Sequence, residues 1–87
     1  SLPAILDAFL EWLKPRRAPD TFEWYRYRLE RLAQRYPKLS ASKLTCEMVE
    51  DWVDEYKLSI TSRRNYFRAV KKAMKWARSR GLIAKNR

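Results

Sequence analysis

The sequence predicts an all-α fold, a compact four-helix bundle whose last helix is long and basic. A single Gly and only four Pro leave few breaks inside the apolar segments, and Val, Ile and Thr are too sparse for alternating strands. Apolar residues instead recur at intervals of three and four, as on amphipathic helices. With 87 residues, 46% of them hydrophobic, the chain is expected to form one domain spanning residues 1–87.

The first two predicted helices flank a proline-containing connection. The first runs from about Pro3 to Lys14 and is apolar nearly all round, which predicts a largely buried helix. The second runs to about Tyr36 from Asp20, which is expected to be its N-cap in a capping box with Glu23. One face of this helix is apolar, and another is predicted to be basic with an aromatic in it: Trp24, Arg28, Arg31 and Arg35.

The third predicted helix begins after the N-cap Thr45 and continues to about Lys57. It has an apolar face made of Val49, Trp52, Val53 and Tyr56, and an acidic face made of Glu47, Glu50, Asp51, Asp54 and Glu55. Sites for hard cations gather oxygen ligands from loops or from several elements, so a single acidic helix face is expected to lie in solvent. With one Cys and no His, the chain also has no zinc-ligand set.

The fourth predicted helix begins between Ser59 and Ser62, ends at Gly81 and carries the excess charge. From Leu58 to Arg87 the chain has ten Lys or Arg and no Asp or Glu, which equals the net charge of +10. At about 100° per residue, one stripe collects Arg64, Arg68, Lys71, Lys75 and Arg78. The opposite face collects Tyr66, Phe67, Val70, Ala73, Met74 and Ala77. Cations without interspersed acids indicate a nucleic-acid surface, because each neutralised phosphate releases counterions.

The sequence has no arrangement of residues that predicts enzymatic chemistry. It has no His, no glycine-rich loop, and no Ser or Cys placed beside a base. We therefore expect no catalytic residue, no metal and no cofactor. The N-terminal apolar run, residues 2–13, contains Asp7 and Glu11 and is shorter than the ~20 residues of a membrane span, so no membrane insertion is expected.

The order of these elements resembles the core-binding, SAM-like N-terminal domain of tyrosine recombinases and phage integrases. The second helix is similar to the family's T-x-x-x-Y-x-x-x-L pattern through Thr21, Tyr25 and Leu29. The third is similar through Leu44-Thr45 and Val49-Glu50-Asp51-Trp52-Val53. The long fourth helix and its G-x-I-x-x-N-P exit are similar through Thr61, Asn65, Phe67, Val70-Lys71, Ala73, Trp76-Ala77 and Gly81-Leu82-Ile83-Ala84-Lys85-Asn86. Arg87 stands where the family usually has Pro.

The resemblance implies a role in site-specific DNA integration and recombination. In that family, this domain forms half of a clamp around duplex DNA, with its second and fourth helices at the major groove of the core site. Because the family's catalytic residues belong to a separate domain, that domain is expected to follow Arg87, and this chain is not expected to be an enzyme by itself. The implied partners are double-stranded DNA, the catalytic domain and other recombinase protomers, in the cytoplasm of a bacterial or phage-host cell.

Carried onto this sequence, the resemblance nominates DNA-facing residues on two helices. The principal ones lie on the fourth helix and are Arg63, Arg64, Asn65, Arg68, Lys71, Lys72 and Lys75. Secondary candidates on the second helix are Trp24, Arg26 and Arg28. Most of the cations are expected to hold phosphates, while Asn65 and Arg64 are expected to contact base edges.

Two other interpretations remain open at this stage. The chain could be a small helical protein-interaction module that uses its acidic third helix and its basic fourth helix. It could also be a helix-turn-helix regulator built from residues 45–80. Against the second interpretation, the fourth helix is about twice the usual length of a recognition helix, and no Gly occurs in the turn.

Overall fold

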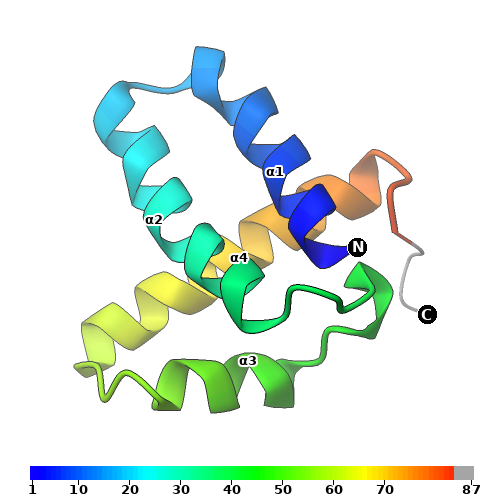
Figure 1. The fold of residues 1–87 in the computed structure, drawn as a ribbon. Helices are drawn as coiled ribbons and strands as arrows, with labels where there is room; N and C mark the ends of the chain where they lie inside the picture. The colour runs from blue at the N-terminus through cyan, green and yellow to red at the C-terminus, as the bar shows by residue number, and fades with distance from the viewer. Residues whose placement is uncertain (84–87) are drawn as a thin grey trace.

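The computed structural model describes residues 1–83 and shows four α-helices (Figure 1). They are α1 (Leu2–Leu13), α2 (Pro19–Arg35), α3 (Cys46–Asp54) and α4 (Ile60–Ser79). Two short 3-10 turns, η1 (Lys14–Arg16) and η2 (Ala41–Lys43), lie in the connections after α1 and α2. No strand occurs in residues 1–83, so the predicted all-α bundle is confirmed.

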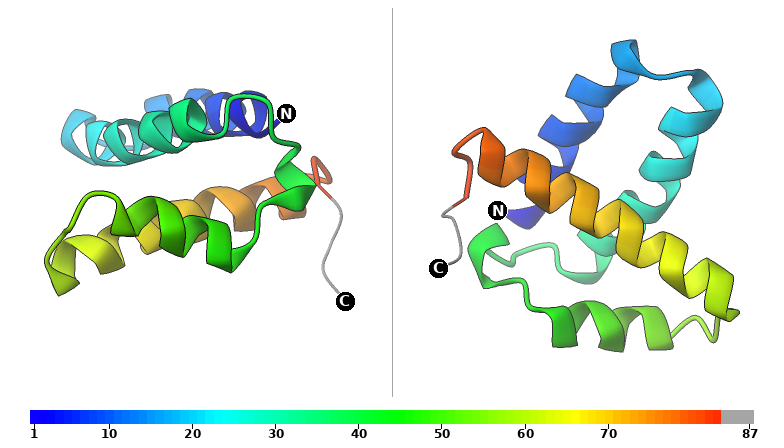
Figure 2. Two further views of the ribbon diagram at one scale, coloured as in Figure 1. Left: turned by 60° about the horizontal axis from the view of Figure 1, so that its bottom comes forward. Right: turned by 180° about the vertical axis from the view of Figure 1, so that it is seen from behind.

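The helices form two layers. α1 and α2 run side by side as a hairpin, and α3 and α4 make the second layer, with α4 crossing behind the hairpin (Figures 1 and 2). The core lies between the layers, and its largest fully buried side chains are Leu2, Leu6, Phe9, Leu13, Leu29, Leu32, Trp52 and Val53. Since α4 turns its small buried residues, Ala69, Ala73 and Ala77, toward this core, its opposite face is left at the surface.

Polar caps fix the ends of the second layer. The Thr45 hydroxyl accepts a 3.2 Å hydrogen bond from the Met48 backbone N–H, which confirms Thr45 as the N-cap of α3. Ser59 caps α4 in the same way, by accepting from the Ser62 N–H at 3.2 Å. After α4, Gly81 has a φ of 73°, the left-handed conformation that ends many helices and that glycine adopts without strain.

Two predicted boundaries differ from the structure. α2 begins at Pro19 with Ala18 as its N-cap, so Asp20 lies in the first turn and the predicted capping box is wrong. The physical reason is that a proline at the first helical position has no N–H to satisfy and already has a helical φ. α3 ends at Asp54 rather than near Lys57. The N–H groups of residues 55–57 donate to carbonyls three residues back, and Lys57 then takes a positive φ of 50° that turns the chain toward α4.

Candidate nucleic-acid interface

The exposed face of α4 carries cations that have no carboxylate beside them. Within residues 1–83, none of the following forms an ion pair: Arg64, Arg68, Lys71, Lys72, Lys75 and Arg78. All of them are exposed except Arg78, which is half-buried. The predicted stripe is therefore confirmed as a surface feature. Because these charges are neither paired nor buried, their field extends into solvent, where it attracts anions.

Arg63 differs from the other predicted cations of α4. Its guanidinium forms an ion pair with the Asp54 carboxylate at the end of α3 and lies over the Phe67 ring, 5.4 Å from the ring centroid. The side chain thus joins α4 to α3 across the short connection between them. Part of its charge is neutralised before any ligand arrives.

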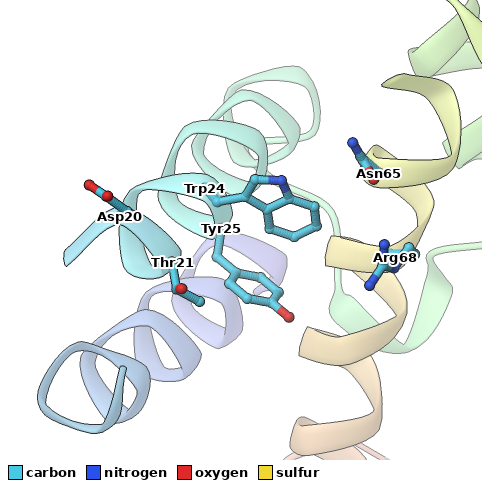
Figure 3. A pocket seen from close by; sticks show the side chains of 6 residues that line it. All are labelled: Asp20, Thr21, Trp24, Tyr25, Asn65 and Arg68. Atoms are coloured by element: carbon cyan, nitrogen blue, oxygen red, sulfur yellow. The ribbon is translucent and has the colours of Figure 1, made fainter. Parts of the chain in front are cut away.

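A hollow of about 450 Å³ opens between α2 and α4 (Figure 3). Trp24 and Tyr25 line it from α2, and Asn65 and Arg68 line it from α4, with Asp20 and Thr21 at the start of α2. Three of the predicted residues, Trp24, Asn65 and Arg68, thus meet in one place. Amide, carboxylate and guanidinium groups together supply the donors and acceptors that can pair with base edges.

Sequence reasoning missed the contribution of Asp20, Thr21 and Tyr25 to this hollow. Asp20 was predicted to be a cap, Thr21 and Tyr25 were named only in the family-like pattern, and the structure leaves Tyr25 half-buried. One signal was available, because Asp20 and Trp24 are four residues apart and so lie on one face of α2. The sequence alone could not show that this face lies across from Asn65.

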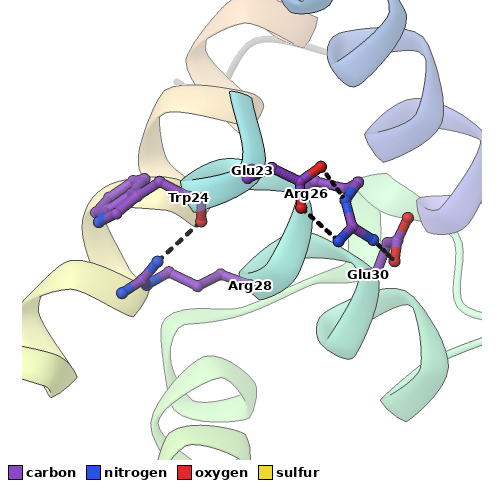
Figure 4. Close-up of polar contacts among 5 residues, drawn as sticks. All are labelled: Glu23, Trp24, Arg26, Arg28 and Glu30. Carbon is purple, nitrogen blue, oxygen red and sulfur yellow. Dashed lines mark hydrogen bonds and ion pairs between the residues drawn. The ribbon is translucent and has the colours of Figure 1, made fainter. Parts of the chain in front are cut away.

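Trp24 is held firmly at the edge of the hollow. Its ring meets the Tyr25 ring edge to face, with centroids 4.7 Å apart. The Arg28 guanidinium lies 4.3 Å from the Trp24 ring centroid and donates a 2.9 Å hydrogen bond to the Trp24 carbonyl (Figure 4). The indole is therefore positioned before any ligand binds.

The predicted basic face of α2 does not form. Arg28 also lies over the buried Tyr66 ring of α4, at 5.3 Å, and Arg31 donates a 2.5 Å hydrogen bond to the Tyr66 hydroxyl. Arg35 forms a 2.9 Å ion pair with Glu55 beyond the end of α3. All three side chains connect α2 to the second layer; Arg28 and Arg31 are half-buried there, and Arg35 stays exposed but is paired. A helical wheel could not reveal this, because a guanidinium on a long stem can pack flat against aromatic rings.

Arg26 lies on the other side of α2 from Trp24 and Arg28 (Figure 4). It forms ion pairs with Glu23 at 2.5 Å and with Glu30 at 2.8 Å. The hydrogen bond from Arg26 is the main reason why the pKa of Glu23 lies below its usual value. This secondary candidate is therefore set among carboxylates and lies away from the α2–α4 hollow.

A second basic hollow lies between α1 and the C-terminal half of α4. It measures about 260 Å³ and is lined by Trp12, Lys72, Lys75, Trp76, Ser79 and Arg80. The Trp12 and Trp76 rings pack with centroids 5.8 Å apart, and Arg16 and Arg80 lie over the Trp12 ring at 4.8 and 5.5 Å. Arg16 and Arg80 were not predicted as site residues. They extend the basic surface from α4 onto the end of α1.

Other classes of site find no support in residues 1–83. This part of the chain contains no group of three His, Cys, Asp or Glu arranged to hold a metal ion. Nor does it contain a helix that is long and apolar enough to cross a membrane. No family model, no curated protein and no solved structure matches the chain.

Proposed function

We propose that this chain is a double-stranded-DNA-binding domain of a tyrosine recombinase or phage integrase. The observation that carries the DNA-binding part is the exposed stripe of unpaired cations on α4, next to the hollow that contains Trp24, Asn65 and Arg68. The stripe supplies affinity for phosphates that does not depend on sequence. The hollow supplies polar groups that can distinguish base edges.

The dimensions of α4 suit a DNA groove. From Arg64 to Arg78 the stripe rises roughly 21 Å, at about 1.5 Å per residue. The major groove is roughly 12 Å wide and admits an α-helix. Phosphates follow one another every ~3.4 Å of helix axis on each strand, so the stripe could reach roughly four to seven of them.

The proposed roles follow from the surroundings of each side chain. Arg64, Lys71, Lys72 and Lys75 would bind phosphates, because they are exposed and unpaired. Asn65 and Arg68 would face bases, with Trp24 packed beside them. Arg63, Arg26 and Arg28 would contribute less, because their guanidinium groups are already engaged with carboxylates or rings.

The recombinase part of the proposal rests on the succession of sequence motifs and on an all-α bundle with a long last helix. Under this proposal, strand cleavage belongs to a catalytic domain elsewhere in the full-length protein. The present domain would grip one side of the core site, together with that domain and with other protomers. The expected compartment is the cytoplasm, where such a protein meets DNA.

A second candidate function is protein interaction, and the charge distribution favours it. Glu47, Glu50 and Asp51 are exposed on α3 and unpaired within residues 1–83, whereas α4 has no acidic residue. Two copies could associate head to tail, with α3 of one against α4 of the other. Sedimentation at ~100 µM and physiological salt tests this, since functional self-association should be visible at that concentration.

The DNA-binding proposal is tested by titrating a fluorescent 20-base-pair duplex with the domain at several salt concentrations. Log affinity should fall linearly with log salt, with a slope of roughly −4 to −6, or about −0.9 per phosphate contacted. A slope near zero, or no binding by a folded domain at low salt, would refute the proposal.

A further inference from the structure

Ile60, the first residue of α4, has the most exposed large hydrophobic side chain in residues 1–83, at 72%. It lines a hollow of about 500 Å³ together with Phe67, which packs against the edge of the core. The remaining lining residues are all cations: Arg63, Arg64, Arg68 and Lys71. The hollow thus combines two apolar side chains with a basic rim.

The hollow belongs to the same face of α4 as the unpaired cations, so Phe67 lies beside the stripe and not opposite it as predicted. Ile60 lies four residues before Arg64, and Phe67 lies four residues before Lys71, so each apolar side chain is a helical neighbour of a cation in the stripe. A ligand held by Arg64, Arg68 and Lys71 would therefore cover Ile60 as well. Scattered exposed aliphatic side chains are normal on proteins, but this one stands inside the surface proposed to bind DNA.

DNA offers few apolar groups to such a surface. In the major groove, base pairs present hydrogen-bond donors and acceptors, and the one apolar group is the C5 methyl of thymine. We propose that Ile60, supported by Phe67, contacts a thymine methyl group in the major groove and gives the domain a preference for thymine there. This inference rests on the proposed DNA-binding function and adds a base preference to it.

The geometry is consistent with this assignment. The side chain at the first position of a helix lies near the end that enters the groove when a helix docks by its N-terminal half. Arg64 and Asn65 are one turn further along and would face the neighbouring phosphates and base pairs. Ile60 itself makes no contact that the fold needs, since it lies outside the hydrophobic core.

The test compares two duplexes that differ only in the methyl group. One is a 20-base-pair alternating dA·dT duplex, and the other is its dA·dU counterpart, which has the same phosphates and the same hydrogen-bonding groups. Burying one methyl group corresponds to roughly a fourfold change in affinity, so wild-type protein should bind the dA·dU duplex at least about fourfold more weakly. Ile60→Ala should lower affinity for the dA·dT duplex to the level of dA·dU and should leave dA·dU binding unchanged.

Leu82→Ala is the matched control. Leu82 is also exposed, at 46%, but it lines a separate hollow with Ser1, Ile5 and Ser40. This variant should retain the full difference between the duplexes. Equal wild-type affinity for both duplexes, or a difference that persists in Ile60→Ala, would overturn the thymine assignment while leaving the DNA-binding proposal in place. Failure of folded wild-type protein to bind either duplex would refute the DNA-binding proposal itself.

Discussion

The Arg31 guanidinium of α2 donates a 2.5 Å hydrogen bond to the hydroxyl of Tyr66, a buried residue of α4. The same guanidinium lies 4.1 Å from the Tyr56 ring centroid. A charged side chain that was predicted to lie on a basic face of α2 thus joins the two layers of the fold. Its partners are a hydroxyl and aromatic rings rather than a carboxylate.

Removing the Tyr66 hydroxyl should destabilise the domain without changing its core volume. Tyr66→Phe keeps the ring but leaves the partly buried Arg31 without its acceptor, so we expect a loss of about 1–3 kcal/mol in the free energy of unfolding. Urea denaturation followed by circular dichroism measures this loss. Tyr27→Phe is the control, because Tyr27 is 52% exposed, and it should stay within about 0.5 kcal/mol of wild type. If Tyr66→Phe leaves the free energy of unfolding unchanged, the hydrogen bond contributes nothing to stability.

Two tryptophan substitutions should have different effects. Trp52 is fully buried and donates a 3.0 Å hydrogen bond to the Tyr56 hydroxyl, so Trp52→Ala should cost about 3–5 kcal/mol and largely unfold so small a domain. Trp24 is half-buried at the α2–α4 hollow. Trp24→Ala should therefore cost less stability but weaken DNA binding by about 1 kcal/mol or more. Thermal melts and DNA titrations decide this, and equal melting temperatures for the two variants would contradict it.

Reversing charge on the two faces should separate binding from folding. Arg68, Lys71 and Lys75 are exposed and unpaired in the described chain, so replacing all three with Glu should abolish DNA binding and leave the helical content unchanged. Replacing Glu47, Glu50 and Asp51 with Lys should leave binding intact or tighten it. This set spares Asp54, which pairs with Arg63. If the folded α3 variant loses DNA binding, then DNA contacts α3 and the proposed binding face on α4 is wrong.

Two arginines provide a sharper comparison of single charges. Because Arg68 is proposed to face bases, Arg68→Gln should weaken DNA binding more at some sequences than at others. Arg26→Gln should change neither the affinity for DNA nor its dependence on sequence, because Arg26 is already paired with Glu23 and Glu30. Titrations of both variants on two duplexes of different sequence make the measurement. If Arg26→Gln weakens binding as much as Arg68→Gln, then Arg26 contacts DNA on α2 as the sequence predicted.

Much of the fold could be predicted from apolar spacing and helix ends. Trp52 and Val53 are buried as their spacing on α3 predicts, and Thr45 and Gly81 mark helix ends because their cap chemistry is local. The N-cap of α2 was misplaced by two residues, at Asp20 instead of Ala18, because two local rules competed there: Asp20 favours an N-cap, whereas Pro19 favours the first helical turn. Boundaries of this kind depend on preferences that differ by little free energy.

The surface position of the cations was predicted well on α4 and poorly for Arg28 and Arg31 on α2. The stripe is exposed from Arg64 to Lys75 because Ala69 and Ala73 on the opposite side occupy the core, and the helical period alone predicts this. Arg28 and Arg31 are spaced along one helix face like the cations of α4, yet contacts with Tyr66 in the other layer decide their positions. Cations that stack on rings and cations that face solvent look identical in a sequence. The contacts of Arg28 and Arg31 with Tyr66 join residues 35 or more positions apart.

The unequal distribution of charge between α3 and α4 also acts before any contact is made. A molecule whose unpaired cations lie on one helix and whose free carboxylates lie on another has a large dipole moment, and a nearby polyanion exerts a torque on it. During diffusion this torque turns α4 toward the polyanion and α3 away from it, so fewer encounters are lost to wrong orientations. Under the proposed DNA-binding function, the acidic helix would need no contact of its own to contribute to the rate of association, and salt would remove that contribution.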